Sequence, residues 1–282
     1  MRRITSFPNW FSGVMLLALP LLGLGLGCKS GNSIARSTAN FPTGTGFIRQ
    51  DFVIDGQSRP LWMFIPKNYD AAHRYPAIVF LHGLFEAGAG GEQCLSAGLG
   101  PVIAKDPEHW PFITIFPQSG GTWKGAHREM LVLAALDYAQ SRWSIDANRV
   151  ILAGLSYGGL GTWEIGAKHP DRFAALVPVS GHRAPELVER LLLLPVWAFS
   201  FSGDPWVRCE SSEVMCAEIE EHGGNARLTE FAGVGHDCWD RAVGESNLVN
   251  WMLQQRRGAI ARPPAGPSPV ARGADTAVAH VE

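Results

Sequence analysis

A serine placed to act as a nucleophile lies in the segment Gly154-Leu155-Ser156-Tyr157-Gly158. The segment follows the apolar run 150–153 and precedes a stretch compatible with a helix. A serine on a sharp turn between a strand and a helix has a strained backbone, and glycines two residues before and after it avoid collisions across the turn. The spacing therefore predicts a turn that exposes the Ser156 hydroxyl above a sheet.

A serine hydroxyl is a weak nucleophile at neutral pH, so it needs a general base and a carboxylate that orients the base. His236 ends the glycine-rich segment 233–236, and Asp204 comes shortly after an apolar, strand-like run. The chain order serine, aspartate, histidine is one in which this triad recurs on an α/β sheet. We therefore expect Ser156, Asp204 and His236 to be catalytic. Three other acids compete for the orienting role, of which the first two are too close to His236 in sequence: Asp237, Asp240 and Glu210.

The negative oxygen of a tetrahedral intermediate requires preorganised N–H donors. The backbone N–H of Tyr157 follows the nucleophile, and a second donor is expected after Leu81-His82-Gly83, from Leu84 or Phe85. We expect His82 itself to support this loop by hydrogen bonds. The chemistry needs no cofactor, and the segment 236–238 lacks the paired spacing of zinc ligands, so no metal is expected.

Strand-like and helix-like segments alternate through the middle of the chain. Short apolar runs suit parallel strands that are buried on both faces. This alternation indicates an open α/β sheet with its site at the carboxyl ends of the strands, where Ser156, His82 and Asp204 fall. The expected strands are 47–54, 60–65, 77–81, 112–116, 150–153, 174–179, 196–201 and 226–231, and the expected helices include 128–142 and 211–221.

The first 28 residues are typical of an export signal. Arg2 and Arg3 precede the apolar stretch 14–26, and the stretch ends in Gly25-Leu26-Gly27-Cys28, which resembles the lipobox of bacterial lipoproteins. Lipidation of Cys28 would attach the protein to a membrane of the bacterial envelope, whereas cleavage nearby would secrete it and an uncleaved segment would anchor it. All three alternatives predict an exported protein.

The rest of the chain predicts a single folded domain. With 282 residues, of which 46% are hydrophobic, the chain can bury a sizeable core. Residues 29–45 are rich in serine, glycine and threonine and are expected to form a flexible tether, whereas residues 257–282 have the composition of a disordered tail. The catalytic domain is therefore expected to span residues 46–256.

Charge and cysteine content limit the partners and the cross-links. A formal net charge of −2 with scattered basic residues argues against a nucleic-acid partner and favours a small neutral substrate or an uncharged polymer. Export permits disulfides, and four cysteines after Cys28 allow three pairings. A bridge between Cys209 and Cys238 would tie together the loops of the acid and the base, but free buried thiols are the alternative.

Several segments together resemble the family of secreted polyhydroxybutyrate-depolymerase-like and feruloyl-esterase-like α/β hydrolases, also described as predicted peptidases. The resemblance covers about residues 46–253 and implies an α/β-hydrolase fold, with a mostly parallel sheet and helices on both faces. It also implies the triad Ser156, Asp204 and His236 and the hydrolysis of esters. The chain departs from relatives at Ser119, where they often have cysteine, and at Ser202, where they often have histidine. The segments that carry the resemblance are 59–66, 75–83, 116–118, 146–150 and 236–239.

Only residues 180–194 separate two expected strands after the nucleophile, which leaves no room for a large lid. An open cleft favours esters on a polymer or on a bulky aromatic acid. Aromatic side chains in nearby loops could bind such a substrate, with inward-packed loop anchors as the alternative. The candidates are Trp123, Trp206 and Trp239, with His182 and Arg183 as weaker ones.

Two other functions remain open. A serine peptidase of the prolyl-oligopeptidase kind would use the same triad, although such enzymes usually carry a propeller domain. A catalytically silent binding lipoprotein could retain the fold without the chemistry.

Overall fold

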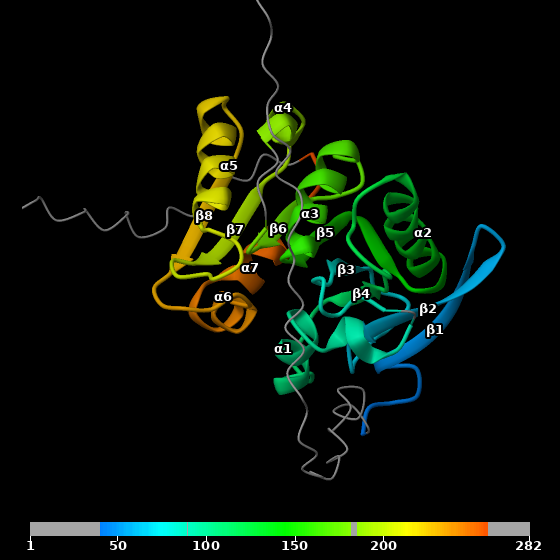
Figure 1. The fold of residues 1–282 in the computed structure, drawn as a ribbon. Helices are drawn as coiled ribbons and strands as arrows, with labels where there is room; N and C mark the ends of the chain where they lie inside the picture. Colours follow the sequence, from blue (N-terminus) through cyan, green and yellow to red (C-terminus); the bar gives the residue numbers. More distant parts are fainter. Residues whose placement is uncertain (1–39, 89, 182–184, 259–282) are drawn as a thin grey trace, which may run out of the picture. The chain divides into compact units, whose positions relative to one another are not determined.

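The computed structural model describes residues 40–88, 90–181 and 185–258 (Figure 1). The predicted export signal with Cys28, most of the predicted tether, residues 259–282 of the predicted tail, and the candidates His182 and Arg183 lie outside the described residues.

The described residues form one eight-stranded sheet in the order β1-β2-β4-β3-β5-β6-β7-β8. The six neighbouring strands β4, β3, β5, β6, β7 and β8 run parallel to one another. Strand β2 is antiparallel to both of its neighbours, β1 and β4. This mostly parallel sheet is the predicted one. The strands are β1 Gly46–Ile54, β2 Gln57–Ile65, β3 Tyr75–Leu81, β4 Ile113–Pro117, β5 Ile145–Leu155, β6 Ala175–Val179, β7 Val196–Phe201 and β8 Ala226–Phe231.

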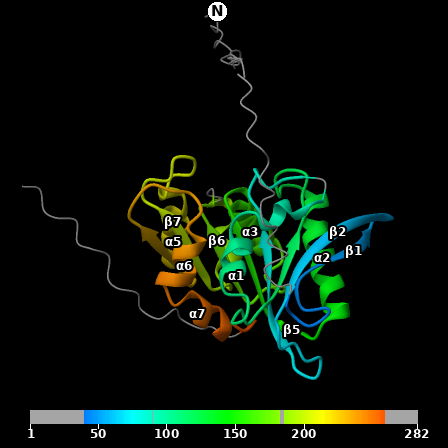
Figure 2. The ribbon, with the colours of Figure 1, turned by 90° about the horizontal axis from the view of Figure 1, so that it is seen from below.

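Helices cover both faces of the sheet (Figures 1 and 2). One group, α2 to α5, packs against one face, and α1, α6 and α7 pack against the other. The helices are α1 Leu99–Lys105, α2 Ala126–Arg142, α3 Tyr157–Lys168, α4 Val188–Leu191, α5 Glu210–Glu221, α6 Trp239–Glu245 and α7 Leu248–Gln254, with short 3₁₀ turns η2 Glu92–Leu95 and η3 Pro185–Leu187.

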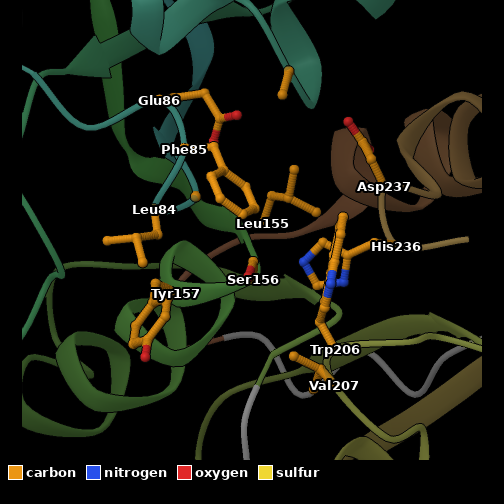
Figure 3. Close-up of a pocket in the computed structure, with 12 residues that line it drawn as sticks. Leu84, Phe85, Glu86, Leu155, Ser156, Tyr157, Trp206, Val207, His236 and Asp237 are labelled. Atoms are coloured by element: carbon orange, nitrogen blue, oxygen red, sulfur yellow. The ribbon is translucent and has the colours of Figure 1, made fainter. Parts of the chain in front are cut away.

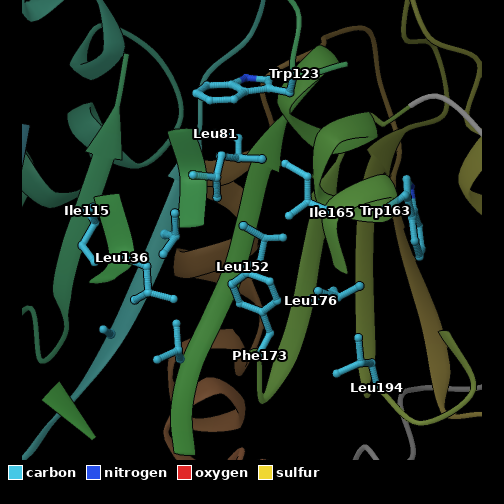
Figure 4. Close-up of a cluster of buried hydrophobic side chains, with 14 of the residues drawn as sticks. Leu81, Ile115, Trp123, Leu136, Leu152, Trp163, Ile165, Phe173, Leu176 and Leu194 are labelled. Carbon is cyan, nitrogen blue, oxygen red and sulfur yellow. The ribbon is translucent and has the colours of Figure 1, made fainter. Parts of the chain in front are cut away.

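Alternating side chains along the central strands build two cores. Val79 and Leu81 of β3 point into the core beneath α2 and α3, while Phe80 between them points into the opposite core. Leu152 of β5 belongs to the first core, which Figure 4 shows packed between the sheet and its helices. Because both faces of these strands are buried, their sequences are continuous apolar runs, which explains why the runs predicted strands.

The register of the sheet brings the ends of distant strands together. Leu81 at the end of β3 lies opposite Gly154 of β5, and Leu155 lies opposite Val179 of β6. Phe201 at the end of β7 lies opposite Phe231 of β8. The segments that follow these strands therefore start at one edge of the sheet, as predicted for Ser156, Asp204 and the loop after His82.

The folded body includes residues just beyond the predicted limits of 46–256. The ring of Phe41 packs edge-to-face against Phe64, with 6.2 Å between the ring centroids. At the other end, the guanidinium of Arg257 donates a hydrogen bond of 2.8 Å to the Asn148 side chain. None of the described helices is both long enough and apolar enough to span a membrane.

The contact of α3 with β3 gives a stability prediction. A Cβ atom at Gly158 would lie 1.9 Å from the carbonyl oxygen of Leu81, so Gly158→Ala forces the backbone to move. We expect the free energy of unfolding to fall by roughly 1–3 kcal/mol or more, as for other overpacked sites. Urea denaturation measures this change.

The matched control is Gly244→Ala in α6, where a Cβ atom meets nothing within 4 Å. That substitution should leave stability unchanged or raise it by up to about 1 kcal/mol, because alanine favours a helix over glycine. Equal urea midpoints for the two variants would contradict the close contact at Gly158.

Candidate active site

Ser156 lies on the sharp turn between β5 and α3. Its backbone has φ 58° and ψ −115°, a conformation that residues other than glycine rarely adopt. Two backbone hydrogen bonds hold the turn, from Ser156 N to Val179 O (2.9 Å) and from Leu160 N to Ser156 O (3.0 Å). The turn is the one that the glycine spacing predicts.

The glycines on either side of the serine are required by close backbone contacts. A Cβ atom at Gly154 would lie 2.3 Å from the carbonyl oxygen of Gly158. Because Gly158 in turn lies against Leu81 of β3, the first turn of α3 is wedged between two strands. Side chains at either glycine would push the serine away from the edge of the sheet.

His236 and Asp204 meet at the carboxyl ends of β8 and β7. Nδ1 of His236 lies 2.7 Å from Oδ2 of Asp204, and the Asp204 side chain is fully buried. The other carboxylate oxygen of Asp204 accepts hydrogen bonds from the backbone N–H groups of Trp206 (2.9 Å) and Val207 (3.0 Å). A carboxylate can only accept here, so Nδ1 carries the proton and Nε2 is left as an acceptor.

The three competing acids have other partners. Asp237 accepts a hydrogen bond from Gly98 N (2.7 Å), Asp240 pairs with Lys105, and Glu210 pairs with Arg208. Of the four candidates, Asp204 is the one bonded to the imidazole.

A pocket of about 370 Å³ opens beside these residues and is lined by both Ser156 and His236. Figure 3 shows Ser156 and the imidazole ring of His236 among the residues that line this pocket. Serine, histidine and aspartate thus come together in the order in which proton transfer would use them.

The loop after β3 passes directly beside the nucleophile. A Cβ atom at Gly83 would lie 3.6 Å from the Cβ of Ser156. Leu84 and Phe85 follow in this loop and line the pocket, and Tyr157 lines it from the start of α3. The candidate donors for an oxyanion therefore lie next to Ser156, and the choice between Leu84 and Phe85 stays a prediction.

His82 supports this loop from inside. Its Nδ1 donates to the carbonyl oxygen of Gly83 at 2.6 Å, and its Nε2 accepts from the backbone N–H of Ser119 at 3.0 Å. Burial lowers the pKa of His82 to about 4, which keeps the ring neutral. As expected, His82 has a supporting place in the loop and does not line the pocket.

The predictions for two tryptophans are wrong. Trp123 and Trp239 are fully buried and line no part of the pocket. The indole N–H of Trp123 donates to the carbonyl oxygen of His82 at 2.8 Å, and Trp239 packs against Phe80. Both are the inward-packed loop anchors of the alternative interpretation, because each ring packs against buried neighbours.

Trp206 is the tryptophan that borders the pocket. Its side chain is 62% exposed, and its ring lies edge-on to the imidazole of His236 with 4.8 Å between the centroids. It also lies 5.8 Å from the ring of Phe85, so two exposed aromatic rings stand at the pocket.

Ser180 is a site residue that the sequence analysis missed. Its hydroxyl donates to the backbone carbonyl of His236 at 2.6 Å and so holds the loop that carries the imidazole. Like Ser156, it has a positive φ, 47°, directly after a parallel strand. Its position at the end of the apolar run 174–179 was the signal that could have found it.

All four cysteines in the described residues have free thiols, which is the alternative to a bridge between Cys209 and Cys238. Cys238 is buried, and burial raises the pKa of its thiol to about 12. The site is therefore held by hydrogen bonds and packing. Within the same residues, no cluster of three or more His, Cys, Asp or Glu side chains could hold a metal ion.

Comparisons with known proteins agree with this architecture. Residues 124–184, which contain the serine turn, match the prolyl oligopeptidase family. A bifunctional acetylxylan esterase/xylanase from Neocallimastix patriciarum is 25% identical over 138 residues, which is 45% of this chain and 18% of that protein. An uncharacterized secreted protein from Arthroderma benhamiae is 25% identical over 254 residues, covering 71% of this chain and 26% of that protein. The chain thus spans about a quarter or less of these curated relatives.

Among solved structures, a thermostable esterase superposes with a TM-score of 0.68 at 28% identity, covering 75% of this chain and 63% of the other. A ferulic acid esterase from Anaeromyces mucronatus superposes with a TM-score of 0.55 at 14% identity, covering 74% and 92% of the two chains. Together with the sheet order and the turn at Ser156, these similarities show that the chain has the α/β-hydrolase fold, which it shares with these esterases.

Proposed function

We propose that the protein is a serine esterase that cleaves carboxylic esters through an acyl-serine intermediate. The observation that carries this proposal is the convergence of Ser156, His236 and Asp204 at one pocket, with the imidazole bonded to the buried carboxylate at 2.7 Å.

In the proposed reaction, the Ser156 hydroxyl attacks the ester carbonyl while Nε2 of His236 accepts its proton. Asp204 stays ionised and stabilises the imidazolium through the bond at Nδ1. The backbone N–H groups of Tyr157 and Leu84 donate to the oxyanion of the tetrahedral intermediate. His236 then returns the proton to the leaving alcohol, and a water molecule repeats the sequence to release the acid.

The substrates that we propose are acetyl or aromatic acyl esters carried on a polymer. The acetylxylan esterase and ferulic acid esterase relatives support this class. The described part of the segment between β6 and β7 contains only η3 and the short α4, which leaves the approach to the pocket open. The exposed rings of Phe85 and Trp206 offer apolar faces to an aromatic or sugar ring.

A peptidase is the second candidate, since the prolyl oligopeptidase match covers the serine turn. That match spans residues 124–184, a segment that contains neither Asp204 nor His236. The match therefore reflects the serine turn, which serine peptidases and serine esterases of this fold share. The proposal of ester hydrolysis rests on the other relatives.

A substrate panel tests the reaction. We expect p-nitrophenyl acetate and methyl ferulate to be hydrolysed, a prolyl peptide to be left intact, and Ser156→Ala to lower the ester rate by about 10⁴-fold or more because the nucleophile is lost. A fluorophosphonate probe should label the wild type and not the variant.

The control for this panel is Ser211→Ala at the start of α5, which should keep full activity. Cleavage of the peptide alone would replace the esterase proposal with the peptidase. A folded wild type that neither reacts with the probe nor hydrolyses any ester would favour the silent binding protein.

The acid is tested by Asp204→Asn. An amide at this position donates to or accepts from the imidazole without fixing the productive tautomer, so we expect kcat to fall by roughly 10⁴-fold, with a smaller change in KM. The matched control is Asp240→Asn, which removes an exposed carboxylate four residues after His236. This variant should change kcat by less than about threefold. Similar losses in both variants would contradict the assignment of Asp204.

We also propose that the protein is exported and held in the bacterial envelope by a lipid on Cys28, as the lipobox-like segment suggests. The secreted relative supports export. Expressed in a bacterium, the wild type should partition with membranes and incorporate labelled palmitate, and Cys28→Ser should not incorporate it. Wild-type protein that stays in the soluble cytoplasmic fraction would contradict export.

A further inference from the structure

Two carboxylates that the proposed mechanism does not use line the pocket. Glu86 comes from the loop after β3, and Asp237 follows His236 in the loop after β8. In Figure 3 both carboxyl groups point into the space above Ser156, from opposite sides.

Backbone N–H groups donate hydrogen bonds to both carboxylates, and those to Glu86 come from Glu86 itself and Gly83. Asp237 accepts hydrogen bonds through Oδ2 from Gly98 N (2.7 Å) and through Oδ1 from Trp239 N (3.1 Å). Oε2 of Glu86 lies only 2.7 Å from where a Cβ atom of Gly83 would stand, and that same point is 3.6 Å from the Cβ of Ser156. The Glu86 carboxylate is therefore a near neighbour of the nucleophile.

The two carboxylates share the pocket wall with His236, but with no permanently charged cation among the described residues that line it. Among the described residues that line the pocket, none is lysine or arginine. Lys105 pairs with Asp240 and Arg241 with Glu245, whereas the charge of Arg128 acts on His82 at the start of this loop without lining the pocket. Burial raises the pKa of Glu86, and hydrogen bonds from the backbone N–H groups of Glu86 and Gly83 oppose this rise. The negative charge of Asp237 adds to the rise, and His236 opposes it.

Aromatic faces complete this environment. The rings of Phe85 and Trp206, set edge-to-face 5.8 Å apart, border the same pocket. Aromatic rings beside carboxylates are the surroundings that proteins use to bind ammonium groups, since ring quadrupole and carboxylate charge both attract a cation.

We propose that Glu86, assisted by Asp237, sets the charge selectivity of the pocket, so that esters bearing a cationic group near the scissile bond are preferred and anionic esters are excluded. This inference rests on the proposed esterase function and narrows its substrate class. Glu86 acts on binding and on the reacting complex through charge, whereas Ser156, His236 and Asp204 carry out bond cleavage.

The alternative is that Glu86 only stiffens the loop beside Ser156. Loss of such support would lower the rate for all esters alike. A charge filter changes the ratio of rates between substrates of opposite charge, and that ratio separates the two roles.

The test uses two matched substrate series in which charge varies at constant shape. One series is methyl 3-(4-X-phenyl)propionates and the other is 2-(4-X-phenyl)ethyl acetates, with X being trimethylammonio, tert-butyl or sulfonate. Because two saturated carbons separate the substituted ring from the ester and insulate it from the electronic effect of X, intrinsic reactivity is nearly constant within a series. The quantity measured is kcat/KM at pH 8 and low ionic strength.

For the wild type we expect the trimethylammonio ester to exceed the sulfonate ester by about tenfold or more in at least one series, as for a unit charge several ångströms from a carboxylate. The preference should shrink toward unity in Glu86→Gln and reverse in Glu86→Lys. Added salt should weaken the wild-type preference because it screens charges. This salt effect tests the proposal even if a variant fails to fold.

Glu213→Gln is the matched control, since it removes the same charge from an exposed position on α5 and should keep the wild-type ratio. A wild-type ratio near 1 in both series, or a Glu86→Gln variant that keeps the wild-type ratio, would overturn the inference. If instead no ester of either series, whatever its charge, were hydrolysed, the esterase proposal itself would fail.

Discussion

The contact between the first turn of α3 and the end of β3 is the constraint on which the candidate site depends. Gly158 packs so closely against the carbonyl of Leu81 that no side chain fits between them. This contact fixes the direction in which α3 leaves the sheet and holds Ser156 in its strained turn. It also brings the loop after β3 within a few ångströms of the serine, so one packing contact places both the nucleophile and the candidate oxyanion donors.

The position of His236 relative to Ser156 depends on the order of strands in the sheet. Strand β6 lies between β5 and β7, and Ser180 at its end ties the backbone of His236 to the neighbourhood of Ser156. Ser156 and Ser180 both have positive φ, which costs free energy of order 1–3 kcal/mol each. Packing in the cores on both faces of the sheet offsets that cost, because it prevents the ends of β5 and β6 from moving to relieve the strain. The stability of the sheet thus holds the site in a conformation that isolated loops would not adopt.

The sequence predicted the strands and the serine turn well because each depends on local residues. The apolar runs at β3, β5 and β7 are buried on both faces, and the glycines around Ser156 report a backbone contact that only glycine permits. Short helices were missed: α1, α6 and α7 have seven residues each, too few to show a clear helical period. The sequence also did not show which way the tryptophan side chains near the pocket point. Trp123, Trp206 and Trp239 all follow strand ends, and only tertiary packing buries two of them and exposes the third.

The packing of the loop after β3 also bears on the charge of the pocket, where Glu86 and Asp237 lie beside the candidate base His236. His82 stays neutral because burial lowers its pKa to about 4, so the loop beside Ser156 carries no positive charge that would bind a carboxylate tightly. Below pH 6.5 an unfolded chain binds a proton at this histidine that the folded chain refuses, so this group favours unfolding as pH falls from about 6.5 toward 4. Glu86 accepts hydrogen bonds from backbone N–H groups, and no lysine or arginine among the described residues lines the pocket beside it. The fold thus gives this loop a neutral histidine inside, His82, and a carboxylate at the pocket, Glu86. His82 preserves the shape of the loop, and in our proposal Glu86 selects the charge of the substrate that binds beside it.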